Sequence, residues 1–243
     1  MNTCLLDLGN TRFKWILRKN LGKGPVRRAS YAEGNPVETV INALSQGPVF
    51  DRLLVSSVRS SAFNAALQLR YPQKIQMIRI TDSELMPLAY EDTSQFGIDR
   101  YLAALGAREC YSLPLIVVDA GTAVTFDVVN AKGAHLGGCI FPGLQLLRQS
   151  LLNGTEGVEN IDSIGAQLLA KSTAEGVAAG TLTGYGAGVE GVIQALQASL
   201  DGAANVILTG GDAELLQECL TRPVPVDPLL IFHGMNLIDS ESL

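Results

Sequence analysis

The sequence is poor in residues that hold metals or disulfides. Its 243 residues include four cysteines and two histidines, all far apart and without a C-x-x-C pair. Structural zinc sites need closely spaced ligands, so we do not expect a zinc protein. We expect buried small side chains for Cys4, Cys110, Cys139 and Cys219. Surface or satisfied polar positions are the expectation for His135 and His233.

The chain also lacks a basic face and a long apolar run. Its formal net charge is −6 and its Lys and Arg residues are mostly scattered, so nucleic acid is not an expected partner. No uncharged stretch is both long and apolar enough to span a bilayer, and the first residues have no basic segment of a signal peptide. We therefore expect a cytoplasmic protein that does not bind membranes.

The sequence does have the composition of a folded protein, and it contains an internal repeat. Of the residues, 47% are hydrophobic and 17% are charged, which is enough apolar surface for a sizeable core. The run Val117–Asp127 reads as an apolar strand ending at Asp119, a turn through Gly121 and Thr122, and a second apolar strand. Such a hairpin presents backbone N–H groups to phosphate.

The same pattern opens the chain. Asp7, Gly9 and Asn10 precede Asp119, Gly121 and Thr122 by a constant offset of 112 residues, and each set sits in an apolar hairpin. One D-x-G-[NT] tetrad is a weak signal, whereas two at equivalent places indicate a duplication. We predict two domains, residues 1–112 and 113–243.

Apolar runs and helical patterns alternate along the chain, which predicts an α/β fold with mixed sheets. Strands are expected at 25–31, 53–55, 75–80 and 205–208, in addition to the two hairpins. Helices are expected at 36–44, 57–69, 97–110 and 144–152, and a further helix follows Asp212 and runs through Leu216. An apolar C-terminal helix, 228–238, is expected to pack back across the two halves.

Glycines mark other turns and one helix. Gly137 to Gly143 serve either close approach of a ligand or turn geometry, and Thr209, Gly210 and Gly211 follow a strand as an anion cradle would. Glycines at 176, 180, 184 and 188 share one helical face, for helix packing or for a ligand. The G-x-G-x-x-G at 186–191 lies inside that helix, so it is not a dinucleotide motif.

These turns suit a nucleoside triphosphate. No Walker A or protein-kinase signature is present, so backbone donors from two hairpins would hold the phosphates. Lys14 is a candidate phosphate contact, and Asp7 is a candidate to orient Mg²⁺ through water. At the start of a predicted helix, Asp99 could accept a proton while Arg100 binds an anionic acceptor.

Together these motifs resemble the type III pantothenate kinase family. The shared motifs are Asp7-x-Gly9-Asn10-Thr11-x-x-Lys14, Gly97-x-Asp99-Arg100, Asp119-x-Gly121-Thr122-Ala123-x-Thr125-x-Asp127, Gly137-Gly138-x-Ile140-x-Pro142-Gly143 and Thr209-Gly210-Gly211. The resemblance implies the actin, Hsp70 and sugar-kinase fold, with two ribonuclease-H-like domains and an interdomain nucleotide cleft. It also implies ATP-dependent phosphorylation of pantothenate to 4′-phosphopantothenate, the first step of coenzyme A biosynthesis.

The resemblance assigns roles to individual residues. The ATP-binding residues would be Asp7, Leu8, Gly9, Asn10, Thr11, Arg12, Phe13, Lys14, Thr122, Thr209, Gly210 and Gly211. The pantothenate-binding residues would be Tyr90, Gly97, Ile98, Asp99, Arg100 and Thr173, with Asp99 as the catalytic proton acceptor. Asp119 would bind a monovalent cation, K⁺ or NH₄⁺, and Asp7 would bind Mg²⁺ through water.

The resemblance also implies a homodimer that completes the pantothenate site. We expect the glycine-lined helix face to pack at or near the dimer contact. Two other classes compete with the kinase. A non-catalytic nucleotide-binding regulator of the same fold would not need Asp99 and Arg100. An ATP-driven chaperone or filament protein would not need the Gly97–Arg100 motif, and 243 residues leave no room for a peptide-binding domain.

Overall fold

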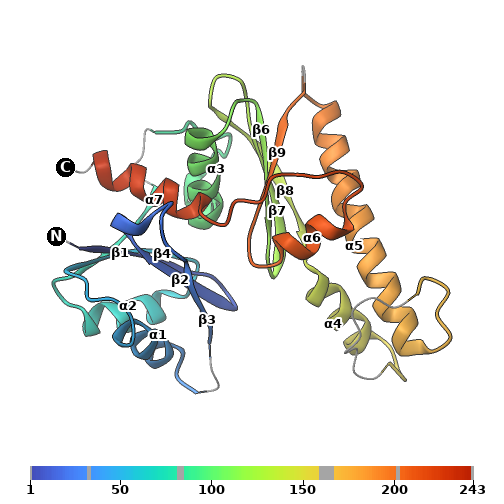
Figure 1. Ribbon diagram of the computed structural model, residues 1–243, viewed down its shortest axis with the longest axis horizontal. Coiled ribbons are helices and arrows are strands. Elements are labelled where there is room, and N and C mark those ends of the chain that lie inside the picture. Colours follow the sequence, from blue (N-terminus) through green and yellow to red (C-terminus); the bar gives the residue numbers. More distant parts are fainter. Residues whose placement is uncertain (1, 32–33, 81–84, 159–166, 201–202, 242–243) are drawn as a thin grey trace. The chain divides into compact units, whose positions relative to one another are not determined.

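The computed structural model describes residues 2–31, 34–80, 85–158, 167–200 and 203–241 (Figure 1). The chain divides into two compact units. The first consists of Met1–Tyr111, Gly133–His135 and Leu229–Leu243, and the second of Ser112–Lys132 and Leu136–Pro228. This division differs from the one expected from the sequence mainly because the C-terminal residues belong to the first unit.

A mixed sheet forms the centre of the first unit. Its described strands have the order β3-β2-β1-β4-β5, with β1 antiparallel to β2 and parallel to β4. All six residues of β1 are buried, because helices cover both faces of the sheet (Figure 1). The strands are β1 (Thr3–Leu8), β2 (Arg12–Leu17), β3 (Arg27–Ser30), β4 (Arg52–Ser57) and β5 (Ile75–Met77).

The helices of the first unit lie on opposite faces of this sheet. Helices α1 (Pro36–Ser45) and α2 (Ser61–Arg70) cover one face, and α3 (Ile98–Cys110) and α7 (Leu230–Glu241) cover the other (Figure 1). The Asn35 side chain caps α1 by accepting from the backbone N–H of Val37 at 3.0 Å. Two short 3₁₀ helices, η1 (Arg18–Asn20) and η3 (Thr93–Gln95), complete the elements described here.

Helix α7 joins the first unit through backbone contact with α3. A Cβ atom at Gly106 would collide with the Leu230 carbonyl, and one at Gly234 would collide with the Leu102 carbonyl. The buried carboxylate of Asp239 then ties α7 to the sheet, because Arg18 and Arg52 both bind it, at 2.6 and 2.5 Å. Without side chains at the two glycines, the helices approach closely enough to fix α7 in this unit.

The second unit repeats the strand order of the first. Its described sheet has the order β8-β7-β6-β9, with β6 antiparallel to β7 and parallel to β9. The strands are β6 (Leu115–Ala120), β7 (Ala123–Val129), β8 (His135–Pro142) and β9 (Asn205–Thr209). The helices are α4 (Leu144–Gly154), α5 (Thr173–Ala198) and α6 (Ala213–Cys219). Residues 115–120 of β6 fall 112 positions after residues 3–8 of β1, the offset found in the sequence.

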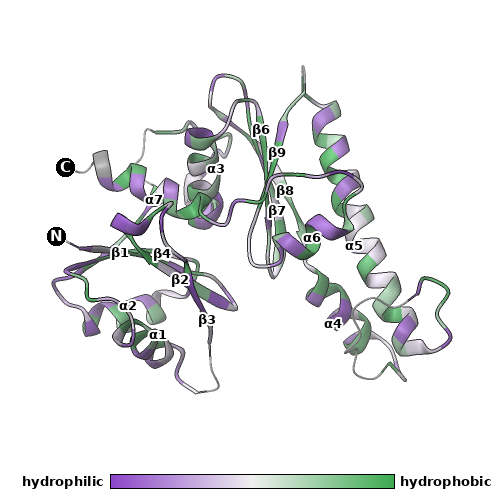
Figure 2. Cartoon of the chain, in the orientation of Figure 1, coloured by the Kyte–Doolittle hydropathy of each residue, from purple (hydrophilic) through white to green (hydrophobic). Residues whose placement is uncertain are grey.

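Among the described residues, apolar side chains form core clusters in both units. In the second unit, Phe126 of β7 packs with Tyr185 and Val189 of α5 and Leu216 of α6. Figure 2 shows the inner strands β1, β4 and β6 as largely hydrophobic. None of the described helices is long and apolar enough to cross a membrane.

Several expectations from the sequence need correction. Helix α2 begins at Ser61 rather than Ser57, since Ser57 ends β4 and the Ser60 side chain caps the helix. Strand β5 ends at Met77, before the expected Ile80. Cys4 is buried as expected, whereas Cys110 and Cys139 are exposed and Cys219 is half-buried. His135 is 2% exposed, so of the two positions expected for it, at the surface or as a satisfied polar group, the surface one does not apply.

Candidate functional site

The first glycine turn lies at the carboxyl end of β1. A Cβ atom at Gly9 would be 2.9 Å from the Arg12 carbonyl oxygen, so the turn needs glycine. Asn10, Thr11 and Arg12 are exposed. Asp7 is 7% exposed and pairs in register with Lys14 of β2, which places both side chains on one face of the sheet. The structure therefore brings a carboxylate and an ammonium group to the face beside an exposed turn.

Two of the residues expected to bind ATP have their side chains in the core. Leu8 and Phe13 have no exposed surface, and the Phe13 ring stacks on Trp15 with ring centres 5.4 Å apart. Successive side chains of a strand point to opposite faces of the sheet, and those of Leu8 in β1 and Phe13 in β2 point into the core. This leaves only main-chain atoms of these two residues for the expected ATP contact.

The start of α3 brings together the motif predicted to bind pantothenate. Asp99 accepts a hydrogen bond through Oδ1 from the Arg100 backbone N–H at 2.9 Å. A Cβ atom at Gly97 would be 2.5 Å from the same Oδ1, so glycine makes room for this carboxylate. Ile98 and Asp99 are half-buried. The carboxylate thus lies at the N-terminal end of α3, which is the positive end of the helix dipole.

Arg100 is held in a wall of aromatic rings. It is 7% exposed, and its Nη1 donates to the Tyr90 hydroxyl at 3.1 Å. Its guanidinium carbon is 4.7 Å from the centre of the Phe96 ring. Phe96 in turn packs against His135, with the two ring centres 4.7 Å apart. Tyr90 and Arg100, placed together by the sequence prediction, do lie together. Phe96 and His135 were not predicted, because their part in this wall depends on tertiary contacts.

The second glycine turn is crowded by backbone from two other segments of its own unit. A Cβ atom at Gly143 would be 2.6 Å from the Thr122 carbonyl oxygen, and one at Gly210 would be 2.5 Å from Asp119 Oδ1. Gly210 also has a φ of 102°, which glycine adopts without strain. Asp119 and Thr209 are paired in the parallel strands β6 and β9. The carboxyl ends of these strands therefore bring Asp119, Thr122, Thr209 and Gly210 to one edge of the second sheet.

The remaining predicted residues also lie in the second unit. Gly211 follows Gly210 before α6, where the Asp212 backbone N–H donates to the Ala120 carbonyl at 2.9 Å. Thr173 is exposed in the first turn of α5, and the Ser172 side chain caps that helix. Gly186 and Gly188, from the rejected dinucleotide motif, lie inside α5 against Cys219 and Phe141. That pattern is a packing feature.

Asp7, beside the first glycine turn, fits a Mg²⁺ ion that is bound together with a nucleotide. No cluster of three His, Cys, Asp or Glu side chains occurs among the described residues. Mg²⁺ usually keeps several waters and is bound through one or two carboxylates together with substrate phosphates. Asp7, beside the first turn, is suited to that role.

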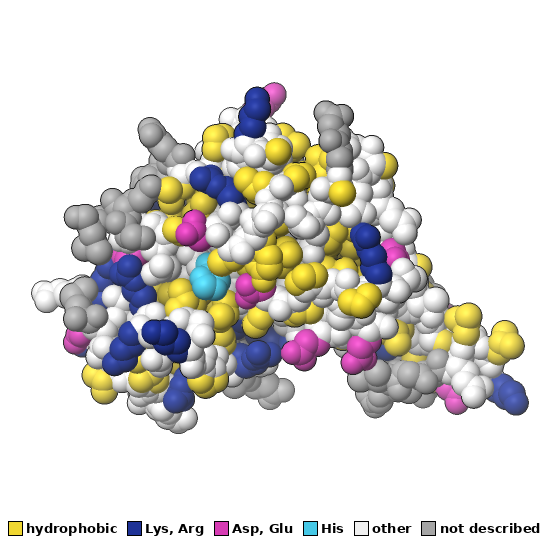
Figure 3. Space-filling model, turned by 45° about the horizontal axis from the view of Figure 1, so that its top comes forward, with side chains coloured by type: hydrophobic (Ala, Val, Ile, Leu, Met, Phe, Trp, Pro, Cys, Tyr) yellow, Lys and Arg dark blue, Asp and Glu magenta, His cyan; other side chains and the backbone are white. Residues whose placement is uncertain are grey.

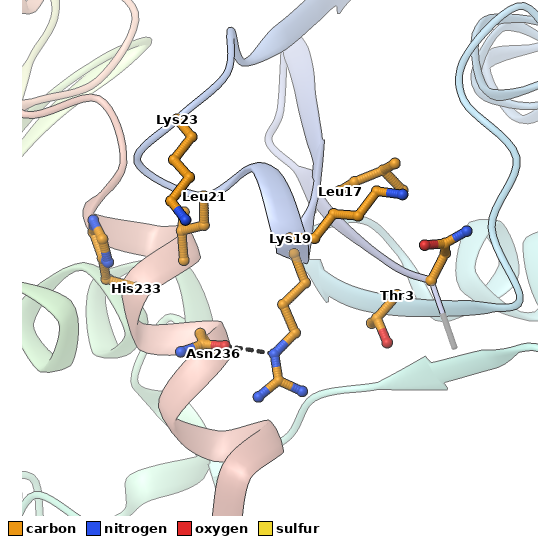
Figure 4. Close-up of a pocket in the computed structure, with 9 residues that line it drawn as sticks. Thr3, Leu17, Lys19, Leu21, Lys23, His233 and Asn236 are labelled. Atoms are coloured by element: carbon orange, nitrogen blue, oxygen red, sulfur yellow. Dashed lines mark hydrogen bonds between the residues drawn. The ribbon is translucent and has the colours of Figure 1, made fainter.

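A cavity of about 530 Å³ lies at the other end of β1. Its lining comes from the first residues of β1, the end of β2 with η1, and α7 (Figure 4). Lys19, Lys23 and His233 contribute positive or titratable groups, and Arg18 Nε donates to Asn236 Oδ1 at 2.7 Å across it. Strand β1 separates this cavity from the Gly9 turn, so it is not part of the candidate site.

Known sequences give a clear match. The family model described as type III pantothenate kinase matches residues 4–195. A type III pantothenate kinase of Halorhodospira halophila is 34% identical over 243 residues, covering 95% of each chain. Another, of Hydrogenovibrio crunogenus, is 36% identical and covers 95% of this chain and 96% of the relative.

Solved structures agree on the fold. A Baf family protein from Campylobacter jejuni matches with a TM-score of 0.63 at 21% identity, covering 98% of each chain. An activator of 2-hydroxyisocaproyl-CoA dehydratase from Clostridium difficile, with bound ADPNP, matches with a TM-score of 0.56 at 15% identity, covering 100% of this chain and 96% of that one. An archaeal actin homologue, Ta0583, matches with a TM-score of 0.54 at 13% identity and covers 99% and 100%. At these identities the likeness concerns the fold alone, which this chain shares with these proteins.

Proposed function

Because the chain belongs to the type III pantothenate kinase family, we infer that it transfers the γ-phosphoryl group of ATP to pantothenate, the first step of coenzyme A biosynthesis. The observation that carries this inference is the family match over residues 4–195, with relatives that align over 95% of the chain. The described geometry supports it, since both glycine turns lie at carboxyl ends of parallel strands. Such turns offer backbone N–H groups to phosphate.

We propose that ATP is bound by the residues of the two turns and of the third glycine motif. The first turn supplies Gly9, Asn10, Thr11 and Arg12, with Lys14 directed at phosphate and the main chain of Leu8 and Phe13 nearby. The second unit supplies Thr122, Thr209, Gly210 and Gly211. Mg²⁺, when bound with ATP through Asp7 and water, neutralises phosphate charge. Asp119 is proposed to bind a monovalent cation, K⁺ or NH₄⁺.

The acceptor site is proposed to form around the start of α3. The 4′-hydroxyl oxygen of pantothenate attacks the γ-phosphorus, the bond from that phosphorus to the bridging oxygen of ADP breaks, and Asp99 takes the hydroxyl proton. Arg100 faces the pantothenate carboxylate, and its bond to Tyr90 fixes the guanidinium orientation. Gly97, Ile98 and Thr173 complete the proposed contacts.

Duplicated domains and an interdomain nucleotide cleft remain part of the proposal. Two features support the duplication: the order β3-β2-β1-β4 of the first sheet recurs as β8-β7-β6-β9 in the second, and the D-x-G-[NT] tetrads end equivalent strands. The cleft and the cytoplasmic location remain predictions from the sequence.

We also propose a homodimer that uses the exposed face of α5. Cβ atoms at Gly180, Gly184 and Gly191 would meet nothing within 4 Å, so the described residues leave this face bare. Large apolar side chains are exposed in the same unit, including Ile140 at 63% and Leu169 at 87%. Figure 3 shows apolar side chains on the surface where α5 begins. Exposed apolar groups near a bare helix face are typical of a protein interface.

The proposed activity is tested by pantothenate-dependent ADP release in potassium and in sodium buffers. Asp99→Asn is expected to lower kcat about 10²- to 10⁴-fold, the usual contribution of a positioned base. Asp92→Asn is the matched control, because Asp92 is an exposed carboxylate that bonds only locally to Ser94 and Gln95. ADP release that does not depend on pantothenate would contradict the kinase assignment and favour a nucleotide-binding regulator.

A further inference from the structure

The first turn is held from one side by two residues that no motif contains. The Tyr31 hydroxyl donates to the Gly9 carbonyl at 3.1 Å, and Arg59 Nη1 donates to the Asn10 carbonyl at 2.8 Å. The Tyr31 backbone N–H donates to the Thr11 carbonyl at 3.4 Å. Three consecutive carbonyl groups of the turn are therefore bound by Tyr31 and Arg59.

This arrangement fixes which way the turn presents its N–H groups. In a trans peptide unit the C=O and N–H bonds point in opposite directions. Since the carbonyls of Gly9 and Asn10 point at Tyr31 and Arg59, the N–H groups of the same peptide units point away from them. Binding the carbonyls on one side thus orients amide dipoles toward the other side, where an anion would be attracted.

Arg59 itself is pre-organised. Its backbone N–H donates to Ser57 Oγ at 3.1 Å, and its carbonyl accepts from Asn64 Nδ2 at 3.2 Å. Its guanidinium carbon lies 4.6 Å from the centre of the Tyr31 ring and 5.1 Å from that of Phe63. Strand β4, which ends two residues earlier, is parallel to β1, so both strands deliver their following residues to the same sheet edge.

The charge of Arg59 is not neutralised by an ion pair among the residues described. Its Nε atom is buried and has no hydrogen-bond partner there. Stacking on aromatic rings keeps the cation in place without a carboxylate. A rigid, uncompensated cation beside an anion-binding turn is arranged for a negatively charged ligand.

Tyr31 is suited to be a constant donor. Burial raises its pKa to about 12, with Arg59 lowering it and the Asp7 carboxylate raising it by smaller amounts. The phenol therefore keeps its proton over the whole physiological pH range. Its hydrogen bond to Gly9 does not depend on pH in that range.

We propose that Tyr31 and Arg59 form a clamp that positions the turn at Gly9–Thr11 for the phosphates of a nucleoside triphosphate, with Arg59 also supplying positive charge to them. The inference deepens the proposed function and rests on it for the identity of the nucleotide. Tyr31 is a positioning residue, since it acts only on the turn, whereas Arg59 acts both on the turn and on the phosphates.

The test is calorimetric binding of Mg²⁺ and a non-hydrolysable ATP analogue, which does not depend on pantothenate turnover. Arg59→Gln is expected to weaken binding about tenfold or more, as loss of a charged hydrogen-bonding group does. The difference from wild type should shrink as salt is raised, because salt screens the attraction between the guanidinium group and the phosphates. Arg70→Gln is the matched control, since Arg70 is an exposed arginine on α2 that pairs with Glu38.

Tyr31→Phe tests the clamp without disturbing packing. It removes only the hydroxyl and keeps the ring that packs against Phe13 and Phe63. About a fivefold loss of nucleotide affinity is expected, the scale of one neutral hydrogen bond. In turnover, both variants should raise the KM for ATP and leave the KM for pantothenate unchanged, whereas a merely structural defect would lower the active fraction and move neither KM.

Two results would overturn the inference, and they are distinguishable. Wild-type protein that binds the nucleotide, with Arg59→Gln and Tyr31→Phe binding it equally well, would refute the clamp alone. Wild-type protein that binds no nucleotide would refute the clamp and the proposed function together.

Discussion

At the scale of the residue, the polar groups near the candidate site differ in whether their hydrogen-bonding capacity is used. Arg100 donates to Tyr90, and Asp99 accepts from the Arg100 backbone. Tyr185 of α5, by contrast, has a fully buried ring, and its hydroxyl has no partner among the described residues. Burial, followed by the carboxylate of Asp212, raises the pKa of Tyr185, so the hydroxyl stays protonated.

Removing the Tyr185 hydroxyl is expected to leave stability unchanged or to raise it. A buried polar group without a hydrogen bond is unfavourable by roughly 1–3 kcal/mol, and Tyr185→Phe removes it while keeping the ring. Urea unfolding of wild type and variant measures the difference in free energy of unfolding. Destabilisation of the variant by more than about 1 kcal/mol would show that the hydroxyl is hydrogen-bonded in the folded protein.

At the scale of the element, the contact between α3 and α7 depends on two glycines. Gly106→Ala is expected to destabilise the protein by about 2 kcal/mol or more, because the new Cβ atom would collide with the backbone of α7 at Leu230. Gly154→Ala, at the C-terminal end of α4, is the matched control. Its Cβ atom meets nothing within 4 Å, so the free energy of unfolding should change by less than about 1 kcal/mol.

Thermal and urea unfolding compare the two variants under one set of conditions. Since α3 begins with the Gly97–Arg100 motif, Gly106→Ala should also raise the KM for pantothenate as α3 shifts. Equal stability of the two variants would contradict the close packing of α3 on α7.

The elements show what sequence patterns can and cannot predict. The Asn35 cap, the two hairpins and the helix containing the glycine stripe follow from local signals, and the structure contains them. The start of α2 was misplaced because Ser57 and Ser60 are both acceptable caps, and sheet pairing with β1 decides between them. Arg59 was missed for a related reason. Its role depends on β4 lying beside β1, and the signal was an arginine just after a buried strand.

The C-terminal helix and the cysteines show the same limit. The apolar pattern of residues 228–238 predicts a helix that packs back across the two halves, whereas α7 belongs to the first unit. That choice depends on the match between Gly106 and Gly234, which are 128 residues apart. Cys110 and Cys139 are exposed because one ends α3 and the other lies in β8, where five of eight residues are exposed. Residue type alone could not indicate those positions.

At the scale of the whole molecule, the bare face of α5 predicts the oligomeric state. Gly180→Leu combined with Gly184→Leu should convert a dimer into monomers, because two large side chains would fill the face on which the partner packs. Pantothenate should then bind more weakly, while ATP binding is retained. Light scattering during size-exclusion chromatography measures the mass, and intact dimers would refute this location of the interface. Leu69→Ala, an exposed apolar residue of α2 in the first unit, is the control.

The activity inferred for this chain is the transfer of a phosphoryl group from ATP to pantothenate. The most direct measurement is mass spectrometry of pantothenate after incubation with the protein, Mg²⁺ and ATP whose γ-phosphoryl group carries ¹⁸O. We expect wild type to form labelled 4′-phosphopantothenate in step with ADP, and Asp99→Asn to lose this product. ADP accompanied by labelled inorganic phosphate and unchanged pantothenate would contradict the inferred activity.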